Sequence, residues 1–545
     1  MANLSPSPSF SFSLATPKRY GPRLGNIIFR RPGLSSSSEP SQAQLEIKTP
    51  GILATTSRGV IPHLSRDHQR RTGAIRWVNV PFETFLEHNP PVPTLQPGAN
   101  PLHTFLGFLP GRQVVSLSAR DPYDGREMPP NGKDHVSVYS LRGVRKLSPN
   151  DWRSHVLGCQ PDVVFSLSDT PFTDPPYSQK RLTKSIERSA TWLANLLRPI
   201  DTGIRLNVLV HMAGGTSIPA RKAFAESLLE KLYGPEAEAV KPFATLDEGV
   251  LGYSFDLLPL RQSLEAQDRK TAILFPPPDN TDFATRTEQI VPLLKASLAS
   301  TPEDKVRLVN SAESPHEILK YISDVGVDLF DAHWAQRAAD VGVALDFEFP
   351  IRQNVIEGDK KKDVGNNLYD ERYALDFGTF ASCFRGTLPS SSSADQDTRP
   401  ICPCAACSPI APSAKIYHGA DTPSFSLEPS TSDSEIAYRP PYTRAYVHHL
   451  LHTHEMSAHA LLVMHNLEVL DAFFAGIRAV LADNPEKWDK EVERFERTYD
   501  GSMLVCVQAR VRWREVDLAR GKGRLAREKT KQEEMEGAAD SSTMA

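Results

Sequence analysis

Short apolar runs alternate with helical patterns through the middle of the chain. Runs of strand length cover residues 162–167, 206–212, 249–255, 305–310 and 326–333. Most are followed by a segment with apolar residues at helical spacing, as in 178–197, where Leu182, Ile186 and Leu193 fall on one face. Ser314 and Pro315 are typical of a helix N-cap and of the first helical position after it. The alternation predicts βα units and a parallel sheet.

The residues that follow the apolar runs are candidate functional positions. In a barrel of βα units, functional groups lie at the C-terminal ends of the strands. The sequence places at these ends Ser168, Asp169, Ala213, Gly214, Asp256 and Asp331. A helix cap or a turn is the alternative interpretation of each, because isolated Asp and Gly residues also serve those purposes.

Length and composition limit the architecture. A chain of 545 residues is long enough for one large domain with additions or for several domains. Its 45 prolines point to long loops, and stretches rich in Ser, Pro and Asp are expected to be loops or linkers at 35–44, 388–400 and 408–441. The formal net charge of -4 gives no overall attraction to nucleic acid or anionic membranes, so such binding needs a local patch.

The sequence also suggests how the chain relates to membranes and what its termini do. No run of about 18 apolar residues occurs, so we expect no transmembrane helix. Residues 1–33 are basic, rich in Ser and free of acids, which is compatible with a disordered leader or with a mitochondrial transit peptide. Basic residues recur through 510–531, either as a solvated helix face or as a strip that contacts phosphates.

Half of the six cysteines lie close together, as Cys402, Cys404 and Cys407. Six cysteines in so long a chain do not form the disulfide framework of a secreted protein, and a reducing compartment is expected. The C-x-C-x-x-C spacing brings three thiolates within reach of one small ion, and a tetrahedral Zn²⁺ site needs a fourth ligand, commonly His or Cys. Spacing does not choose among the downstream histidines, which are His418, His448, His449, His452, His454, His459 and His465. A chance group of buried free thiols is the alternative.

The order of motifs around the cysteines resembles the zinc subdomain of the tRNA-guanine transglycosylase family. C-x-C-x-x-C is followed by TRAYVHHLL and then by LLVMHNLEVLDAFFAGIR. Segments similar to the family's barrel precede it in the family's order, at 47–67, 162–171, 211–228 and 323–333. The resemblance covers roughly residues 20 to 480. This family exchanges guanine for a queuine-type base in tRNA anticodons.

The resemblance implies a fold and a complete set of metal ligands. The fold is a (β/α)8 TIM barrel of the α/β class, with a zinc-binding helical subdomain inserted near its C-terminal end. In the family the fourth zinc ligand is the His of the "HN" pair, which implies His465 and one structural Zn²⁺ ion. Four protein ligands leave no open position for catalysis. The loop 408–441 is longer than in the family, and such an insertion is tolerated because loop-closure entropy grows slowly with length.

The family's catalytic motifs are largely replaced. The resemblance places the nucleophile at Asp331, the last residue of D-L-F-D at 328–331. The general-base motif has no counterpart at 105–121, and Ala213 stands where the family has a base-binding Gln. Ser168 and Asp169 compete for the position of the purine-recognising Asp. We therefore predict no catalytic residue in this chain, with Asp331 as a vestigial nucleophile.

This pattern resembles the non-catalytic accessory branch of the family. The branch implies a heterodimer with a catalytic homologue, which exchanges guanine for queuine at the wobble position of a bound tRNA. It also implies a cytoplasmic location, with peripheral association with the mitochondrial outer membrane. An alternative is an active transglycosylase that uses Asp331 as nucleophile and Asp121 or Asp124 as base. A zinc-dependent RNA-binding module is a third possibility, which would not need the ordered barrel segments.

The expected domain boundaries follow from these assignments. A disordered leader covers 1–20 and a barrel body covers 21–400. A zinc-binding subdomain covers 401–480 and contains the disordered insertion 408–441. A charged helical tail covers 481–545.

Overall fold

The computed structural model describes residues 9–31, 44–171, 175–200, 205–274, 283–352, 360–384, 399–409 and 441–518. The chain divides into two compact units. Unit 1 consists of Met1–Trp334, Glu348–Gly358 and Leu470–Ser502, and unit 2 of Ala335–Phe347, Asp359–Val469 and Met503–Ala545. The predicted linkers at 35–44, 388–400 and 408–441 lie mostly outside the described residues.

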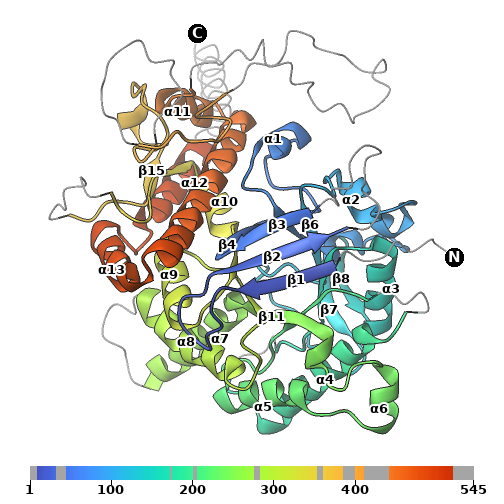
Figure 1. Ribbon diagram of the computed structural model, residues 1–545. Helices are drawn as coiled ribbons and strands as arrows, with labels where there is room; N and C mark the ends of the chain where they lie inside the picture. Colours follow the sequence, from blue (N-terminus) through green and yellow to red (C-terminus); the bar gives the residue numbers. More distant parts are fainter. Residues whose placement is uncertain are drawn as a thin grey trace, which may run out of the picture. The chain divides into compact units, whose positions relative to one another are not determined.

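Parallel strands form a closed eight-stranded barrel in unit 1 (Figure 1). In chain order they are β4 (Gly51–Thr55), β5 (Trp77–Pro81), β6 (Val114–Ser118), β9 (Val163–Phe165), β10 (Val208–His211), β11 (Val250–Asp256), β12 (Val306–Asn310) and β13 (Leu329–Asp331). Every residue of β4, β5, β12 and β13 is buried. Strands covered on both faces are mostly apolar, and β12 and β13 lie within apolar runs whose alternation with helical segments predicted a parallel sheet. The predicted TIM-barrel fold is confirmed.

Helices follow most of the barrel strands. The helices between the barrel strands or directly after the last one are α1 (Arg66–Arg71), α2 (Pro101–Leu106), α3 (Pro149–Cys159), α4 (Gln179–Leu197), α5 (Ile218–Leu229), α6 (Gly234–Ala239), α7 (Leu257–Leu274), α8 (Phe283–Leu298), α9 (Pro315–Asp324) and α10 (His333–Asp340). Unit 1 also contains α13 (Trp488–Thr498), which comes much later in the chain. As predicted, Ser314 caps α9, and its hydroxyl accepts a hydrogen bond from the Glu317 N–H at 3.1 Å. Short 3-10 turns occur at η1 (Phe82–Phe85), η2 (Val92–Leu95), η3 (Asp247–Gly249) and η6 (Pro485–Lys487), and β7 (Val136–Ser140) and β8 (Gly143–Leu147) form a hairpin.

A three-stranded antiparallel sheet precedes the barrel in the chain. It is formed by β1 (Ser9–Leu14), β2 (Gly25–Arg30) and β3 (Gln44–Thr49). Ile27, Phe29 and Ile47 from this sheet join one buried cluster with Trp77 and Val114, which begin barrel strands. The sheet therefore covers the N-terminal end of the barrel and leaves the opposite end for ligands.

The prediction of a disordered leader over 1–20 is wrong where the structure describes it. β1 occupies 9–14, and the Arg19 Nη1 atom donates to the carbonyl oxygens of Leu298 and Ala299 at 2.8 Å and of Thr301 at 2.9 Å. The last carbonyl groups of a helix lack partners within the helix, and here Arg19 bonds to the carbonyl group that ends α8 and to two carbonyl groups just after it. The sequence could not show this, because the partners lie almost 280 residues away along the chain.

Unit 2 is built from short strands and two consecutive helices. β14 (Val343–Leu345) pairs antiparallel with β15 (Gly365–Asn367), and η4 (Glu371–Tyr373) follows them. α11 (Arg444–His452) and α12 (Met456–Asp483) agree with the expected helical subdomain, and α12 continues from unit 2 into unit 1. Residues 504–518 are also helical.

Among the described residues, α12 is the helix long and apolar enough to cross a membrane by length and composition. The mean hydropathy of its most apolar window is 1.5, and 78% of that window is buried inside the structure. The interior helix of a folded domain has the same composition, so α12 is only weak support for a membrane span.

Candidate functional site: the strand ends and a Cys3His cluster

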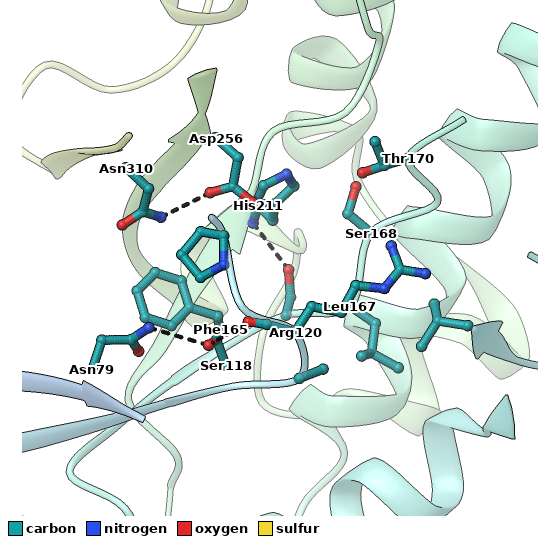
Figure 2. Close-up of a pocket in the computed structure, with 14 residues that line it drawn as sticks. Asn79, Ser118, Arg120, Phe165, Leu167, Ser168, Thr170, His211, Asp256 and Asn310 are labelled. Atoms are coloured by element: carbon teal, nitrogen blue, oxygen red, sulfur yellow. Dashed lines mark hydrogen bonds and ion pairs between the residues drawn. The ribbon is translucent and has the colours of Figure 1, made fainter. Parts of the chain in front are cut away.

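A pocket opens at the C-terminal ends of the barrel strands (Figure 2). Polar side chains from different strands and the loops after them line it, among them Asn79, Ser118, Arg120, Ser168, His211, Asp256 and Asn310. A second pocket shares several of these residues and adds Asp169, Ala213 and Gly214. The structure thus brings together five of the strand-end positions singled out in the sequence. Asp331 lines neither of these two pockets.

Asp256 is the centre of a polar group in the first pocket (Figure 2). The Asn310 Nδ2 atom donates to Asp256 Oδ1 at 2.8 Å, and His211 Nδ1 lies 3.5 Å from Asp256 Oδ2. These residues end three neighbouring strands, β10, β11 and β12. An imidazole, a carboxylate and an amide together offer hydrogen-bond donors and acceptors, so this part of the pocket is polar.

Asp169 is fully buried, and arginines occupy its carboxylate. Arg181 donates to both oxygens at 2.8 Å, and Arg188 donates to Oδ2 at 3.0 Å. Asn131 Nδ2 adds a hydrogen bond to Oδ1 at 2.9 Å. A bidentate Arg–carboxylate pair is among the strongest polar contacts in proteins, and it leaves the oxygens committed to anchoring α4. Of the two residues that competed for purine recognition, Asp169 therefore has a structural role, whereas Ser168 lines the pocket.

Asp331 ends β13 and is fully buried. The backbone N–H groups of Ser311 and His333 donate to its two oxygens, the latter at 2.9 Å. The Tyr123 ring stacks on the His333 ring with centroids 3.5 Å apart. The Tyr123 hydroxyl is near enough to Asp331 to lower the pKa of this carboxyl group. The hydroxyl and the carboxylate do not have the geometry of a full hydrogen bond. Backbone and an aromatic ring therefore enclose this carboxylate.

The protonation of Asp331 reflects this enclosure. Burial raises the pKa of Asp331 to about 7, against the lowering effects of Tyr123 and of the two backbone N–H groups. Near neutral pH a large share of the molecules therefore carry a neutral acid at this position. A carboxylate nucleophile has to be ionised and exposed to its substrate, and Asp331 meets neither condition well.

The segment after β6 covers Asp331 where the family resemblance places the general base. The Ser311 hydroxyl donates to the Pro122 carbonyl at 3.1 Å, which holds this segment against the end of β12. Asp121 accepts a hydrogen bond from the Tyr123 N–H at 3.0 Å, and burial raises the pKa of Asp121 to about 6. Asp124 is paired with Arg126. Both candidate bases of the alternative interpretation thus have local structural partners.

Asp328, the first acid of the D-L-F-D motif, has a structural partner from the N-terminal segment. Arg23 donates to both of its oxygens, at 3.1 Å through Nε and 3.0 Å through Nη2, and both side chains are fully buried. The Arg307 N–H also donates to Asp328 at 2.8 Å. The motif therefore contributes one ion pair to the barrel interior and one enclosed acid at the strand end.

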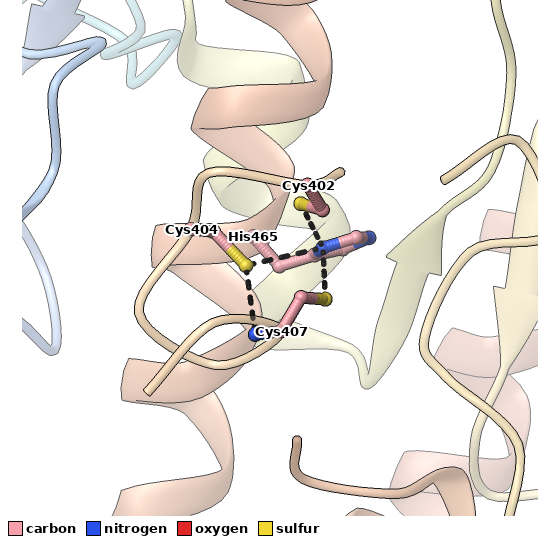
Figure 3. A group of neighbouring side chains, drawn as sticks. All are labelled: Cys402, Cys404, Cys407 and His465. Atoms are coloured by element: carbon pink, nitrogen blue, oxygen red, sulfur yellow. Dashed lines mark hydrogen bonds between the residues drawn. The ribbon is translucent and has the colours of Figure 1, made fainter. Parts of the chain in front are cut away.

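Cys402, Cys404, Cys407 and His465 converge in unit 2, and all four are buried (Figure 3). Their sulfur atoms lie 3.7, 3.6 and 3.5 Å from His465 Nδ1 in that order. The loop that carries the cysteines is closed by two hydrogen bonds from Ser408, to the carbonyl groups of Cys402 and Cys404 at 2.7 and 2.9 Å. Ligands that are adjacent in the chain thus meet one His from the middle of α12.

The histidine and the asparagine after it fasten α12 to β14. His465 Nε2 lies 3.0 Å from the Leu345 carbonyl oxygen, so Nε2 carries the hydrogen and Nδ1 keeps its lone pair toward the sulfur atoms. Asn466 accepts from the Leu345 N–H at 2.9 Å and donates to the carbonyl groups of Ala335 and Val343 at 3.0 Å. In the "HN" pair, His465 is therefore the candidate metal ligand, and Asn466 beside it fixes α12 to β14.

The four residues fit a tetrahedral metal ion. Metal bonds of about 2.3 Å to sulfur and about 2.0 Å to nitrogen at tetrahedral angles put each sulfur about 3.5 Å from the nitrogen, as found here. Hydrogen bonds from Cys404 and Cys407 lower the pKa of Cys402, whereas burial raises the pKa of Cys404, so the group favours one buried thiolate whose charge a cation would compensate. Among the described residues, His465 is the histidine of this group, and His418 lies outside them.

A comparison with protein families identifies the family to which this architecture belongs. The family model for queuine tRNA-ribosyltransferase matches residues 34–240, 280–422 and 426–500. The chain belongs to this family. The matched segments span both the barrel and the Cys3His cluster, so the sequence resemblance noted on the motifs holds over most of the chain.

Curated relatives within the queuine tRNA-ribosyltransferase family carry a more specific name. A Schizosaccharomyces pombe protein named queuine tRNA-ribosyltransferase accessory subunit 2 is 27% identical over 482 residues, which cover 86% of this chain and 83% of the relative. Proteins of the same name from Homo sapiens and Ixodes scapularis are 25% and 24% identical over 436 and 470 residues. These alignments cover 79% and 85% of this chain, and 89% and 95% of the relatives.

The sequence alone did not single out several side chains at the strand ends. His211 and Arg120 line the pocket, and Tyr123 covers Asp331. His211 lies one residue before the end of the predicted run 206–212, so the rule that functional groups lie at strand ends could have found it. Tyr123 carried no such signal, because its role depends on contact with His333, which lies far away along the chain.

Proposed function

We propose that this chain is the non-catalytic accessory subunit of a queuine tRNA-ribosyltransferase, in which it pairs with a catalytic homologue. The observation that carries the proposal is the enclosure of Asp331, whose carboxylate is fully buried and bonded to backbone N–H groups. The names of the relatives point to the same role. The complex exchanges guanine for queuine at the wobble position of a tRNA.

The pocket residues support the same proposal. Exchange by this chemistry needs a carboxylate nucleophile and a second acid or base, both placed against the substrate. Asp331 is enclosed, Asp124 is paired with Arg126, and Asp169 is held by two arginines. Ala213 also lacks a polar side chain with which to bind a purine edge. A buried base whose polar groups remain unpaired binds poorly, so the pocket does not suit the family's substrate.

The Cys3His cluster holds one structural Zn²⁺ ion in this proposal. Three thiolates and one imidazole are the donor set that zinc prefers for closed structural sites, and four protein ligands leave no position for substrate. The ion ties the cysteine loop to α12. Metal binding of this kind fixes local geometry without a large core, which suits a subunit interface.

The partners follow from the same role. The catalytic homologue binds through the zinc subdomain and its neighbouring helices, and exposed arginines in the helical residues 504–518, such as Arg510 and Arg514, contact tRNA phosphates. The complex is cytoplasmic, with peripheral contact with the mitochondrial outer membrane. Fractionation of cells that express the labelled chain tests the location, and recovery in the mitochondrial matrix contradicts it.

Activity measurements test the accessory role. The chain is purified alone and together with its catalytic homologue, and the exchange of labelled guanine is measured in a tRNA with the relevant anticodon. We expect exchange only from the mixture, and we expect Asp331→Asn in this chain to leave that exchange intact. Exchange by the isolated chain that disappears in Asp331→Ala would overturn the accessory role in favour of the active enzyme.

A further inference from the structure

A second group of metal-binding side chains lies in unit 2. His448 and His452 on α11 and Glu371 in η4 offer two imidazole nitrogens and a carboxylate oxygen, all within 4.8 Å of one another. We propose that these three residues form a binding site for a second divalent transition-metal ion. The inference goes beyond the accessory role and does not depend on it.

The spacing of the two histidines suits a shared ion. Residues four apart in a helix lie on the same face, and the ring centroids of His448 and His452 are 4.2 Å apart. His448 is buried, whereas His452 is half-buried. Tyr369 packs edge-on against the His452 ring at 5.7 Å and supports its orientation. The pair is therefore fixed in position and remains within reach of ions from solvent.

Backbone hydrogen bonds fix the tautomer of both rings. His448 Nδ1 lies 2.9 Å from the Leu368 carbonyl oxygen, and His452 Nδ1 lies 3.0 Å from the His448 carbonyl oxygen. A carbonyl oxygen only accepts, so each Nδ1 carries the hydrogen and each neutral ring keeps its lone pair on Nε2. Histidines that bind metals typically donate their other N–H in this way. Both rings are thus arranged as ligands before any ion binds.

Glu371 supplies the third ligand from a different segment. Its Oε2 atom lies 4.0 Å from His448 Nε2, and its side chain is 86% exposed. Metal bonds of about 2.0–2.2 Å bring neighbouring ligand atoms to about 3–3.5 Å, and an exposed Glu side chain can rotate over that distance. The two segments are already joined, because Asp376 forms an ion pair with Arg444 at 2.9 Å and accepts from the Ala445 N–H at 2.7 Å.

The donor set indicates the class of ion. Two imidazole nitrogens and one carboxylate oxygen suit Zn²⁺ and its first-row neighbours, whereas Ca²⁺ and Mg²⁺ prefer oxygen ligands alone. Three protein ligands leave at least one position for water or for a group from outside the chain. The proposed site is therefore open, in contrast to the closed Cys3His cluster.

Zinc stoichiometry tests the proposal. Untagged full-length protein is brought to equilibrium dialysis with micromolar free Zn²⁺, and bound zinc is measured by mass spectrometry. We expect two equivalents per chain in the wild type and one in Glu371→Gln or His452→Gln. The loss of one ligand should raise the apparent Kd of the second equivalent at least about tenfold. With Co²⁺, the second equivalent should add no thiolate-to-metal absorption.

A matched control lies on the same helix. His449 is exposed on α11 and does not belong to the group, so His449→Gln should keep both equivalents. Glu371 is exposed as well, so its substitution does not threaten folding. One equivalent in the wild type that Glu371→Gln and His452→Gln both retain would overturn the proposal. Two equivalents retained in both Glu371→Gln and His452→Gln would also overturn it.

Discussion

Replacement of Asp331 by Asn tests whether this strand end holds a buried, structurally fixed acid. The substitution keeps the size of the side chain and removes a group whose folded pKa is about 7, against an ordinary value of 3.8. The folded state therefore holds a proton that the unfolded chain releases at lower pH. Because this pKa is raised on folding, the proton's contribution to stability is present at low pH and is lost as the pH rises through about 7.

The magnitude follows from the same pKa. Each pH unit between the unfolded and folded pKa values changes the free energy of unfolding by about 1.4 kcal/mol. Between about pH 5 and pH 8 the free energy of unfolding of the wild type should fall by roughly 2.7 kcal/mol because of Asp331. Only the two pH units between about 5 and about 7 contribute, since Asp331 is ionised in both states above its folded pKa. Asn accepts poorly from both the Ser311 and His333 N–H groups, which costs about 1–3 kcal/mol at pH 5. The variant should therefore be the less stable protein at pH 5, and this difference should close or reverse at pH 8.

Urea unfolding followed by tryptophan fluorescence measures this difference, because Trp77 and Trp152 are fully buried in unit 1. The pKa values of Glu83 and Asp121 are also raised by burial, to about 7 and about 6, so the wild-type pH dependence alone does not identify Asp331. The difference in stability between the wild type and Asp331→Asn, measured at each pH, isolates the contribution of Asp331. Substitution of the exposed Asp304 by Asn serves as the control. A stability difference between wild type and Asp331→Asn that stays the same from pH 5 to pH 8 would refute the reasoning.

Three further substitutions test the metal cluster and the barrel. His465→Ala should lower the zinc content of the Cys3His cluster toward zero, whereas the control His454→Ala should leave it unchanged, as measured by mass spectrometry. The opposite pattern would overturn the assignment of His465 as the fourth ligand. Asn466→Ala leaves three backbone groups of unit 2 without their partner, so the free energy of unfolding should fall by roughly 3 kcal/mol while zinc is retained. An unchanged thermal midpoint would contradict this loss of stability. Arg23→Leu leaves Asp328 buried without its counter-charge, so the free energy of unfolding in urea should fall by about 3–5 kcal/mol. A fall of less than about 1 kcal/mol would show that the pair is not buried in solution.

Much of the barrel could be predicted because its signals are local. A strand covered on both faces is mostly apolar, as in β9, and a Ser-Pro pair starts a helix through contacts within one turn, as at Ser314. The N-terminal sheet escaped prediction for the opposite reason. β1 alternates polar and apolar residues among serines and prolines, and its partner strand β2 and the carbonyl groups bound by Arg19 are invisible in a local window.

For the sites, the sequence by itself determined which residue types are present and where they fall along the chain. It determined three thiols within six positions, an acid at the end of β13, and an alanine at position 213, where the family resemblance places a base-binding Gln. Spacing could not choose the fourth metal ligand, because 58 residues separate Cys407 from His465 and only the packing of α12 on β14 brings them together.

Tertiary structure alone decided how these groups behave. It buried Asp331 behind Tyr123, engaged Asp169 with two arginines, and aligned His448 and His452 with Glu371. The reactivity of a carboxylate or an imidazole depends on solvent, charges and hydrogen bonds within a few ångströms. Those neighbours come from segments far apart in the chain, so the folded structure sets the chemistry that the sequence only makes available.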